Sequence, residues 1–309
     1  VGLIVDAARM AQSVAAVVAG FLRHDPAVRV GGVILNRVGS DRHDAMLRRA
    51  LAPLGVTVLG SVPRLDGLHH PSRHLGLVQA GERMDLEGYL QGAATAMTGT
   101  VALTGLAADL PTPGPAPKRS PPAQRIAVAQ DLAFGFAYPH LLNDWRRAGA
   151  EIIPFSPLRD DAVPPCDLIY LPGGYPELHA GKLARAKTFI NSLIKHSYNT
   201  DIYGECGGYM VLGESLTDAD GITHPMAGLL PLATSFAERG LVLGYRKLLS
   251  AAGPFKGVSM AHEFHYASTL RAAGPPLFQA QDAEGTDLPP MGLIRGRVCG
   301  SFAHVIEPV

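Results

Sequence analysis

Cys206 is the residue with the clearest potential for chemistry. It lies in the segment 204–208 (GECGG), between a predicted strand at 201–204 and a short apolar helix at 210–212. Glycines around a nucleophile allow a sharp backbone turn and let a substrate approach closely. A helix N-terminus supplies N–H donors and lowers the pKa of a thiol. The pattern favours a nucleophile at a strand-to-helix elbow over a buried Cys in a Gly-rich turn.

A thiol nucleophile needs a base, and the candidate is His304. It ends the segment 300–304 (GSFAH) and falls in a predicted strand at 301–306. Open α/β folds place their sites at the C-terminal edge of the sheet, which such a His can face. The chain has 12 His, so a surface position would be the better interpretation of His304 alone. A Cys nucleophile in the same domain favours the base.

An oxyanion hole is expected at Gly173 and Gly174, within the segment 171–177 (LPGGYPE). These glycines follow a predicted strand at 168–171, and their N–H groups can point into a crevice without being shielded by side chains. An ordinary strand-to-helix turn has the same pattern, so the two glycines are weak evidence by themselves.

The elements that must position these residues are alternating strands and helices. In the first part of the chain, strands are predicted at 1–5, 30–36 and 56–60, and helices at 11–23 and 42–52. In the second part, strands are predicted at 124–129, 151–155, 168–171, 201–204, 292–298 and 301–306, and helices at 139–148 and 183–195. The alternation predicts an α/β fold with two parallel sheets, the first of them incomplete.

A Pro-rich segment separates the two parts. Residues 110–123 read LPTPGPAPKRSPPA, and Pro removes backbone donors and fixes φ. We therefore expect a first domain at 1–97, a linker at 98–123 and a second domain at 124–309. The strand at 1–5 is an apolar run typical of a strand buried on both faces, so we expect further sequence upstream of it.

Composition excludes several classes of function. The 309 residues are 47% hydrophobic and 17% charged, and 27 Lys+Arg balance 27 Asp+Glu. A nucleic-acid-binding surface would need a basic excess. The longest apolar stretch, 14–22, is too short to span a bilayer, and no signal peptide is visible. Three scattered Cys form no disulfide framework, which favours a reducing cytoplasm.

Several segments resemble one family. The segments 171–177, 203–216 (YGECGGYMVLGESL) and 300–304 are similar, in order and context, to class I glutamine amidotransferase domains. The segment 261–266 (AHEFHY) resembles a block of the cobyrinic acid a,c-diamide synthases, as do 155–158 and 73–77. The segments 5–8 (VDAA) and 32–37 (GVILNR) resemble that family's N-terminal synthetase domain, which has a dethiobiotin-synthetase-like phosphate-loop fold. The segment 140–147 (HLLNDWRR) is most similar to the aerobic branch, which acts on hydrogenobyrinic acid.

The resemblance implies a glutamine-hydrolysing amidoligase. Cys206 would form a glutamyl thioester, His304 would move the proton, and the amides of Gly173, Gly174 and Gly207 would hold the oxyanion. The ammonia would amidate the a and c acetate carboxylates of a corrinoid, hydrogenobyrinic or cobyrinic acid, after ATP has phosphorylated them. The expected ligands are glutamine, the corrinoid, ATP and Mg²⁺, without nucleic acid or membrane, and a homodimer is compatible with this reading.

The sequence departs from the family at two informative places. The phosphate loop, G-x-x-x-x-G-K-[ST], is absent, so the main ATP and Mg²⁺ groups are expected upstream of Val1 and no metal ligand is assigned. Many amidotransferases carry Glu two positions after the base, whereas Glu307 lies three positions after His304. Strand alternation would point Glu307 away from the His side. The expectation is therefore a Cys–His dyad, with Glu307 unassigned.

Other polar residues leave alternatives open. Asn36 resembles the residue that reads adenine in dethiobiotin-synthetase-like domains, or it caps a turn at the end of a strand. Asp6 is an outer Mg²⁺ ligand or, with slight preference, the N-cap of a following helix. His69, His70 and His74 fit no metal-ligand template well. They are interpreted as a polar loop or, with less preference, as a loop against the tetrapyrrole. In the strand at 261–266, His262 and Glu263 would point to opposite faces.

Three other functions compete with that of a glutamine-hydrolysing amidoligase. A cobyric acid synthase would amidate four other side chains, and the HEFHY segment argues against it. A stand-alone cysteine γ-glutamyl hydrolase would leave the first α/β domain without a role. A non-catalytic α/β binding protein would leave Cys206, the Gly pair and His304 unexplained together.

Overall fold

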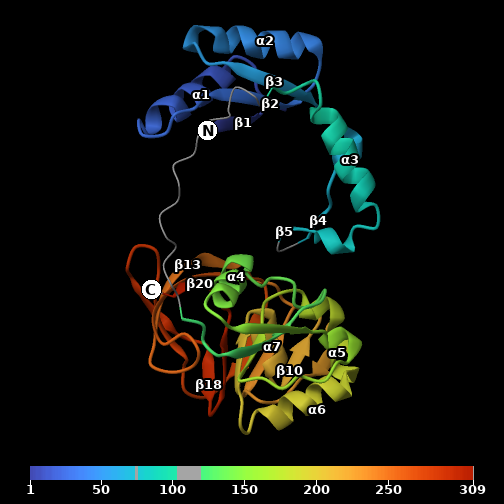
Figure 1. Cartoon of the computed structure of the whole chain (residues 1–309), viewed down its shortest axis with the longest axis vertical. Coiled ribbons are helices and arrows are strands. Elements are labelled where there is room, and N and C mark those ends of the chain that lie inside the picture. Colours follow the sequence, from blue (N-terminus) through green and yellow to red (C-terminus); the bar gives the residue numbers. More distant parts are fainter. Residues whose placement is uncertain (74–75, 103–119, 309) are drawn as a thin grey trace. The chain divides into compact units, whose positions relative to one another are not determined.

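The protein consists of two compact units, drawn in Figure 1 in blue to cyan for the first and in green to red for the second. The computed structural model describes residues 1–73, 76–102 and 120–308. Most of the predicted linker therefore lies outside the described residues, as do His74 and Leu75. The first linker residues pack on the first unit, where an antiparallel bridge joins Val101 to Gly60.

The first unit is built on a parallel three-stranded sheet in the order β1-β2-β3. Its strands are β1 (Gly2–Asp6), β2 (Gly32–Val38) and β3 (Val58–Pro63), and its helices are α1 (Ser13–His24), α2 (Asp41–Leu51) and α3 (Leu86–Met97). Val33 and Leu35 of β2 pack against α1 and α2, whereas Ile34 points to the other face beside Met97. The central strand β2 is thus buried on both faces, as its apolar run requires.

The first strand differs from its prediction. It lies at one edge of this sheet, and Ile4 is 66% exposed. The expectation that both faces of the strand are covered is therefore wrong for the described residues. The helix α3 was not predicted, and none of its side chains is buried.

The second unit has a six-stranded central sheet in the order β18-β19-β9-β8-β6-β7, parallel except for β18. The strands are β6 (Arg125–Ala129), β7 (Glu151–Phe155), β8 (Leu168–Leu171), β9 (Asp201–Glu205), β18 (Leu293–Arg295) and β19 (Val298–Ser301). Every residue of β8 is buried, because both faces of the strand are covered. The α/β fold class and the parallel sheet are confirmed.

Two hydrophobic cores cover the faces of this sheet. One packs β8 and β9 against α5 (Ala180–Arg185), α6 (Lys187–His196) and α7 (Gly207–Leu212). The other packs them against α4 (Pro139–Arg147) and a second, antiparallel sheet. The prediction of a single helix at 183–195 is wrong, because the helical backbone is interrupted at Ala186, between α5 and α6.

The second sheet of this unit has the order β17-β16-β13-β14-β20. Its strands are β13 (Val242–Ser250), β14 (Gly257–His265), β16 (Phe278–Gln281), β17 (Asp287–Met291) and β20 (Ala303–Pro308). A smaller sheet, β11-β10-β12-β15, contains β10 (Ser215–Thr217), β11 (Thr223–Pro225), β12 (Leu232–Ser235) and β15 (Ser268–Ala272). Between residues 215 and 291 the sequence predicted one strand, at 261–266, which overlaps β14. The other strands of this region were missed.

The C-terminal strands also differ from prediction in a way that affects the site. A strand was predicted at 301–306, but the observed strand β20 begins two residues later, at Ala303. The reason is that the chain leaves the central sheet at Ser301 and enters the antiparallel sheet at Ala303. His304 therefore lies on β20, opposite His262 of β14, and not on a strand of the central sheet. No helix among the described residues is long and apolar enough to cross a membrane.

Candidate active site

Cys206 lies at a sharp turn between β9 and α7. Its backbone has φ 45° and ψ −101°, a conformation that L-residues rarely adopt. Its N–H donates to the Ser301 carbonyl oxygen at 2.8 Å, which fixes the end of β9 against β19. The strained backbone of a Cys at the end of a buried strand is the geometry of a nucleophile elbow.

The elbow depends on close packing against the neighbouring strand. A Cβ on Gly208 would lie 1.9 Å from the carbonyl oxygen of Leu171, at the end of β8. The Gly208 N–H donates to the Pro172 carbonyl oxygen at 3.1 Å. Gly208 is therefore required because the first turn of α7 touches the segment that carries Gly173 and Gly174.

His304 lies beside Cys206, with Gly173 between them. A Cβ on Gly173 would lie 2.4 Å from His304 Cε1, 3.2 Å from His304 Nε2 and 3.4 Å from Cys206 Cβ. The Cε1–Nε2 edge of the imidazole and the Cβ of Cys206 therefore both border Gly173. Cys206 and His304 are 1% and 3% exposed, respectively.

The three glycines predicted to form the oxyanion hole meet at the same place. A Cβ on Gly207 would lie 3.0 Å from the Gly174 amide nitrogen. Among the described residues, no backbone partner is found for the Gly173 and Gly174 amides, while the Gly207 N–H donates to the Cys206 sulfur. The structure thus brings together Cys206, His304 and all three glycines, as the sequence led us to expect.

Burial keeps the side chains of Cys206 and His304 uncharged. Burial raises the pKa of the Cys206 thiol to about 12, and the nearby Glu177 acts in the same direction. The expected lowering of this pKa is wrong, because desolvation outweighs the hydrogen bond from Gly207. Burial also lowers the pKa of His304 to about 3, assisted by the charges of His262 and His265. The resting site therefore holds a neutral thiol and a neutral imidazole.

Two aromatic side chains adjoin His304. The His262 ring stacks on His304 with centroids 5.0 Å apart and an interplanar angle of 4°. Tyr138, just before α4, forms a short hydrogen bond with His262 Nε2 and faces His304 edge-on. Burial lowers the pKa of His262. Neither contact was predicted, because both join segments that are far apart in the sequence.

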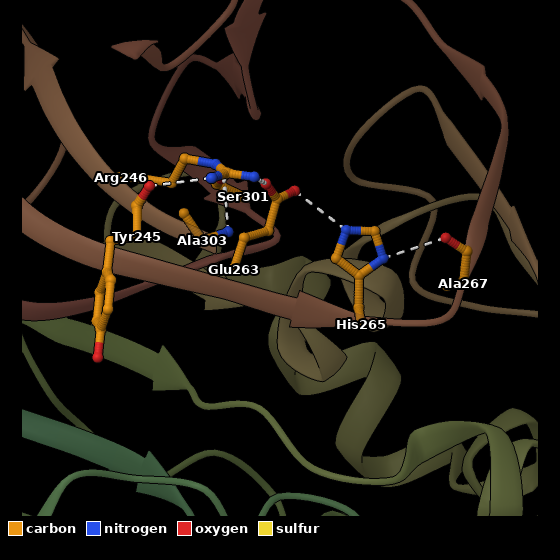
Figure 2. Close-up of polar contacts among 7 residues, drawn as sticks. All are labelled: Tyr245, Arg246, Glu263, His265, Ala267, Ser301 and Ala303. Atoms are coloured by element: carbon orange, nitrogen blue, oxygen red, sulfur yellow. Dashed lines mark hydrogen bonds and ion pairs between the residues drawn. The ribbon is translucent and has the colours of Figure 1, made fainter. Parts of the chain in front are cut away.

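A separate ion-pair network supports the segment that carries His304. Figure 2 shows Glu263 between Arg246 and His265, with Arg246 Nε and His265 Nε2 each donating to the Glu263 carboxylate at 3.0 Å. Glu263 lies opposite Ala303 in the β14–β20 pairing, and the His265 ring stacks on Phe302 with centroids 4.0 Å apart. Glu263 thus points away from the His262 side, as alternation predicted. Its pairing with Arg246 and His265 is structural.

Sequence reasoning missed Glu205, the residue before the nucleophile. Its carboxylate is fully buried, and Tyr170 and Tyr203 donate to it. Oε2 lies 3.8 Å from His304 Nδ1. The available signal was the position of an acidic residue at the end of a strand buried on both faces. Glu307, by contrast, is exposed on β20.

Comparisons with known proteins agree with this arrangement. The sequence model of the CobB/CobQ-like glutamine amidotransferase domain matches residues 125–307. Hydrogenobyrinate a,c-diamide synthase of Brucella anthropi is 51% identical over 315 residues, covering 99% of this chain and 72% of that protein. The protein of the same name from Rhodobacter capsulatus is 48% identical over 312 residues, covering 98% of this chain and 72% of its own length. The chain belongs to the hydrogenobyrinate a,c-diamide synthase family.

The first unit carries the other part of the family pattern. The sequence model of the CobQ/CobB/MinD/ParA nucleotide binding domain matches residues 5–78. A solved glutamine amidotransferase structure covers 58% of this chain at 18% identity with a TM-score of 0.39, values too low to bear on the function. The resemblance inferred from the sequence motifs is thus confirmed for both units.

In this family member, the strands of the first unit end at an open cavity of about 580 Å³. Its lining residues are Asp6, Ala8, Arg9, Met10, Arg37 and Arg64. Three guanidinium groups suit anionic groups such as phosphates. Asp6, an oxygen donor of the kind Mg²⁺ takes, accepts from the Ala8 N–H and pairs with Arg37 at 3.0 Å. The donor set therefore fits part of a nucleotide site.

The predictions for individual polar residues of the first unit have different outcomes. Asp6 does not cap α1, because the N-cap position of that helix is Gln12. Asn36 Oδ1 accepts from the Arg37 N–H at 3.0 Å, a local contact, and adenine recognition by Asn36 stays a prediction. His70 bonds the Val78 carbonyl oxygen and Arg83. Among the described residues, no cluster of three or more His, Cys, Asp or Glu side chains could hold a metal ion.

Proposed function

We propose that this chain hydrolyses glutamine at Cys206 and supplies the ammonia for amidation of the a and c acetate carboxylates of hydrogenobyrinic acid. The observation that carries this proposal is the elbow itself. A Cys with φ 45° at the end of a buried strand shares a glycine neighbour with a buried imidazole. Together with family membership, this geometry supports thioester chemistry at Cys206.

The proposed reaction passes through a glutamyl thioester. Cys206 gives its proton to His304 Nε2, and the sulfur forms a bond to the side-chain amide carbon of glutamine. The C–N bond then breaks as the imidazolium returns the proton to the departing ammonia. A water molecule, deprotonated by His304, hydrolyses the thioester to glutamate and the free thiol. The amides of Gly173, Gly174 and Gly207 stabilise the oxyanion in both halves.

The neutral resting state suits this sequence of steps. Separating charge between a thiol of pKa about 12 and an imidazole of pKa about 3 is unfavourable in the closed site. We infer that proton transfer accompanies glutamine binding, when an oxyanion forms beside the glycine amides. The burial would then restrict thiolate formation to the time when substrate is present.

The first unit would bind ATP with Mg²⁺ and contribute to the corrinoid site. Arg9, Arg37 and Arg64 supply positive charge at the cavity. ATP cleavage supplies the free energy for making an amide from a carboxylate, which is a poor acyl donor. We infer a cytoplasmic enzyme, because its nucleophile is a free thiol and the chain has three Cys without a disulfide pattern.

The alternatives receive less support. Identity of about half of all residues to hydrogenobyrinate a,c-diamide synthases, over nearly the whole chain, favours that reaction over the cobyric acid synthase type. A stand-alone γ-glutamyl hydrolase does not account for the match to a nucleotide binding domain at residues 5–78.

The test is glutamate release from glutamine by the Cys206→Ala variant. We expect a loss of roughly 1,000-fold or more, because the covalent route is removed. Where the phosphate loop is also present, amidation from glutamine is lost and amidation from ammonium salt is retained. Equal loss with both nitrogen sources would contradict the proposal.

Cys166→Ala is the matched control. It makes the same chemical change at a half-buried thiol that lies outside the site. We expect its glutamate release to equal that of the unmodified protein. If Cys166→Ala and Cys206→Ala lost activity to the same extent, the loss would not report on a nucleophile.

A further inference from the structure

Glu205 is held in one position by three hydrogen bonds. Its Oε2 accepts from the Tyr170 hydroxyl at 2.7 Å, and its Oε1 accepts from the Tyr203 hydroxyl at 3.2 Å and the Val305 N–H at 3.0 Å. The side chain is 0% exposed. Val305 directly follows His304, so the carboxylate is tied to the backbone of the strand that carries the base.

The imidazole presents its other nitrogen to this carboxylate. His304 Nδ1 is buried and has no hydrogen-bond partner among the described residues. Its nearest acidic group is Glu205 Oε2 at 3.8 Å, beyond hydrogen-bond range but within ion-pair range. Buried polar nitrogens without a partner are rare, and catalytic hydrogen bonds often shorten only when substrate binds.

We propose that Glu205 is the positioning residue of this site, holding the His304 proton on Nδ1 so that Nε2 is free to accept the thiol proton. This inference rests on the proposed function. In the reaction, Cys206 transfers its proton to Nε2, and the Glu205 carboxylate then stabilises the imidazolium through Nδ1–H. The proton leaves Nε2 with ammonia, and Glu205 itself exchanges none.

The position of Glu205 is unusual for its role. The acidic partner would come from the residue immediately before the nucleophile and not from the strand of the base. Glu307, the nearest acid after His304 in sequence, is exposed. The Cys–His dyad expected from the sequence would thus become a triad whose third member lies on β9.

The ionisation state of Glu205 gives the proposal a signature. Burial raises the pKa of Glu205 from 4.5 to about 7, against the hydrogen bonds from Tyr170, Val305 and Tyr203, which lower it. Below that pH, a protonated carboxyl donates to Nδ1 and leaves the proton on Nε2, where it blocks the base. Above it, the carboxylate accepts from Nδ1–H. Activity should therefore rise with pH near 7.

Other titratable groups surround the pair. His304 is faced by Cys206 at the elbow, Tyr138 before α4, and His262 and His265 on β14. Glu205 is faced by Tyr170 on β8, Tyr203 on β9 and His304 on β20. The pKa values of Cys206 and His304, about 12 and about 3, lie far from 7. His262 is the group that a control must separate.

The decisive variant is Glu205→Gln, with glutamate release measured from pH 5 to pH 9. The amide N–H would donate to Nδ1 and fix the proton on Nε2. We expect kcat to fall about 100-fold to 10,000-fold with KM little changed, and the rise near pH 7 to disappear. Glu307→Gln makes the same change at an exposed acid and should keep both the rate and the pH profile. His262→Gln should keep the rise near pH 7.

A second measurement observes the His304 proton directly in the unmodified protein. Nitrogen-15 NMR of the unmodified protein at pH 8 reports which imidazole nitrogen carries the proton, with His304→Gln used to assign the signal. We expect the proton on Nδ1, moving to Nε2 as the pH falls below about 7. A proton on Nε2 at pH 8 would overturn the proposal, as would an unchanged rate and pH profile in Glu205→Gln.

The two proposals fail in distinguishable ways. If Cys206→Ala retains glutamate release, the proposed function is wrong. If Cys206→Ala is inactive while Glu205→Gln keeps its rate and its rise near pH 7, only the role of Glu205 is wrong.

Discussion

In each of the two units, polar side chains lie at the carboxyl ends of parallel strands, but the two sets differ in their exposure to solvent. In the second unit, Glu205 and Cys206 lie at such an end, and His304 lies beside them on β20. These residues are 0%, 1% and 3% exposed, respectively. In the first unit, the side chains of the Asp6–Arg37 pair are 57% and 54% exposed and border an open cavity. The edge that carries Glu205 and Cys206 is therefore closed to solvent, and the edge that carries Asp6 and Arg37 is open to it.

This difference in burial determines what each edge can do. Burial moves the pKa values of Glu205, Cys206 and His304 far from their ordinary values and fixes the geometry. At the open edge, charges are screened by water, and an exposed ion pair contributes little to stability. The closed edge is suited to proton transfer at fixed positions, and the open edge to attracting an anionic ligand.

The largest expected effect is at the base of the closed edge. His304→Ala should lower glutamate release by roughly 1,000-fold or more, because His304 is the imidazole that borders both Gly173 and the elbow. Thermal unfolding should show that the variant is folded. His196→Ala, on α6, is the control and should retain full activity. Substantial activity in His304→Ala would contradict the role of this side chain.

A smaller loss is expected from a change that removes no side chain of the site. In Gly173→Ala, the new Cβ would lie 2.4 Å from His304 Cε1, so the ring must shift. A displacement of about 1 Å at a catalytic group costs roughly 100-fold in rate. Gly240→Ala is the control, because its Cβ meets no atom within 4 Å. Equal rates in the two variants would show that the ring is not confined.

The elbow strain predicts a stability difference between two inactive variants. Cys206 has φ 45°, and such a conformation costs a non-Gly residue about 1–3 kcal/mol. Cys206→Gly should therefore have a higher free energy of unfolding than Cys206→Ala, by about 1 kcal/mol after the entropy cost of Gly. Denaturant titration measures the difference. A Gly variant less stable than the Ala variant would contradict the assignment of strain.

The smallest effect is expected at the open edge. Arg37→Ala removes an exposed ion pair with Asp6 and should change the free energy of unfolding by less than about 1 kcal/mol. The change should shrink further at high salt. Denaturant titrations at two salt concentrations give the result. A large, salt-independent loss would show that the two edges are more alike than their exposure indicates.

The parts of the structure that could be predicted from sequence are those with local signals. The strands β7 and β8 match their predicted bounds. For β8, a continuous apolar run between turn residues marks a strand buried on both faces. The elbow at Cys206 and the glycine pair could be found because Gly next to a nucleophile has a direct geometric meaning. Helix α4 begins at its predicted residue, Pro139, a residue favoured at the start of helices.

The parts that could not be predicted depend on contacts between distant segments. The strands between residues 215 and 291 pair across long separations and have no helical alternation to mark them. The transfer of the chain from β19 to β20 is set by pairing with β14, which places His304 opposite His262. Glu205 was missed because its contact with His304 joins residues 99 positions apart through a partner that no local pattern shows.

The burial of Cys206 has a consequence for damage by oxidants. Peroxide reacts with thiolates, and oxidation follows both thiolate character and access. A side chain that is 1% exposed, with a pKa of about 12, offers little of either. The sulfur should therefore resist conversion to sulfenic acid while the enzyme is idle and become vulnerable during turnover, so that glutamine would sensitise the enzyme to peroxide.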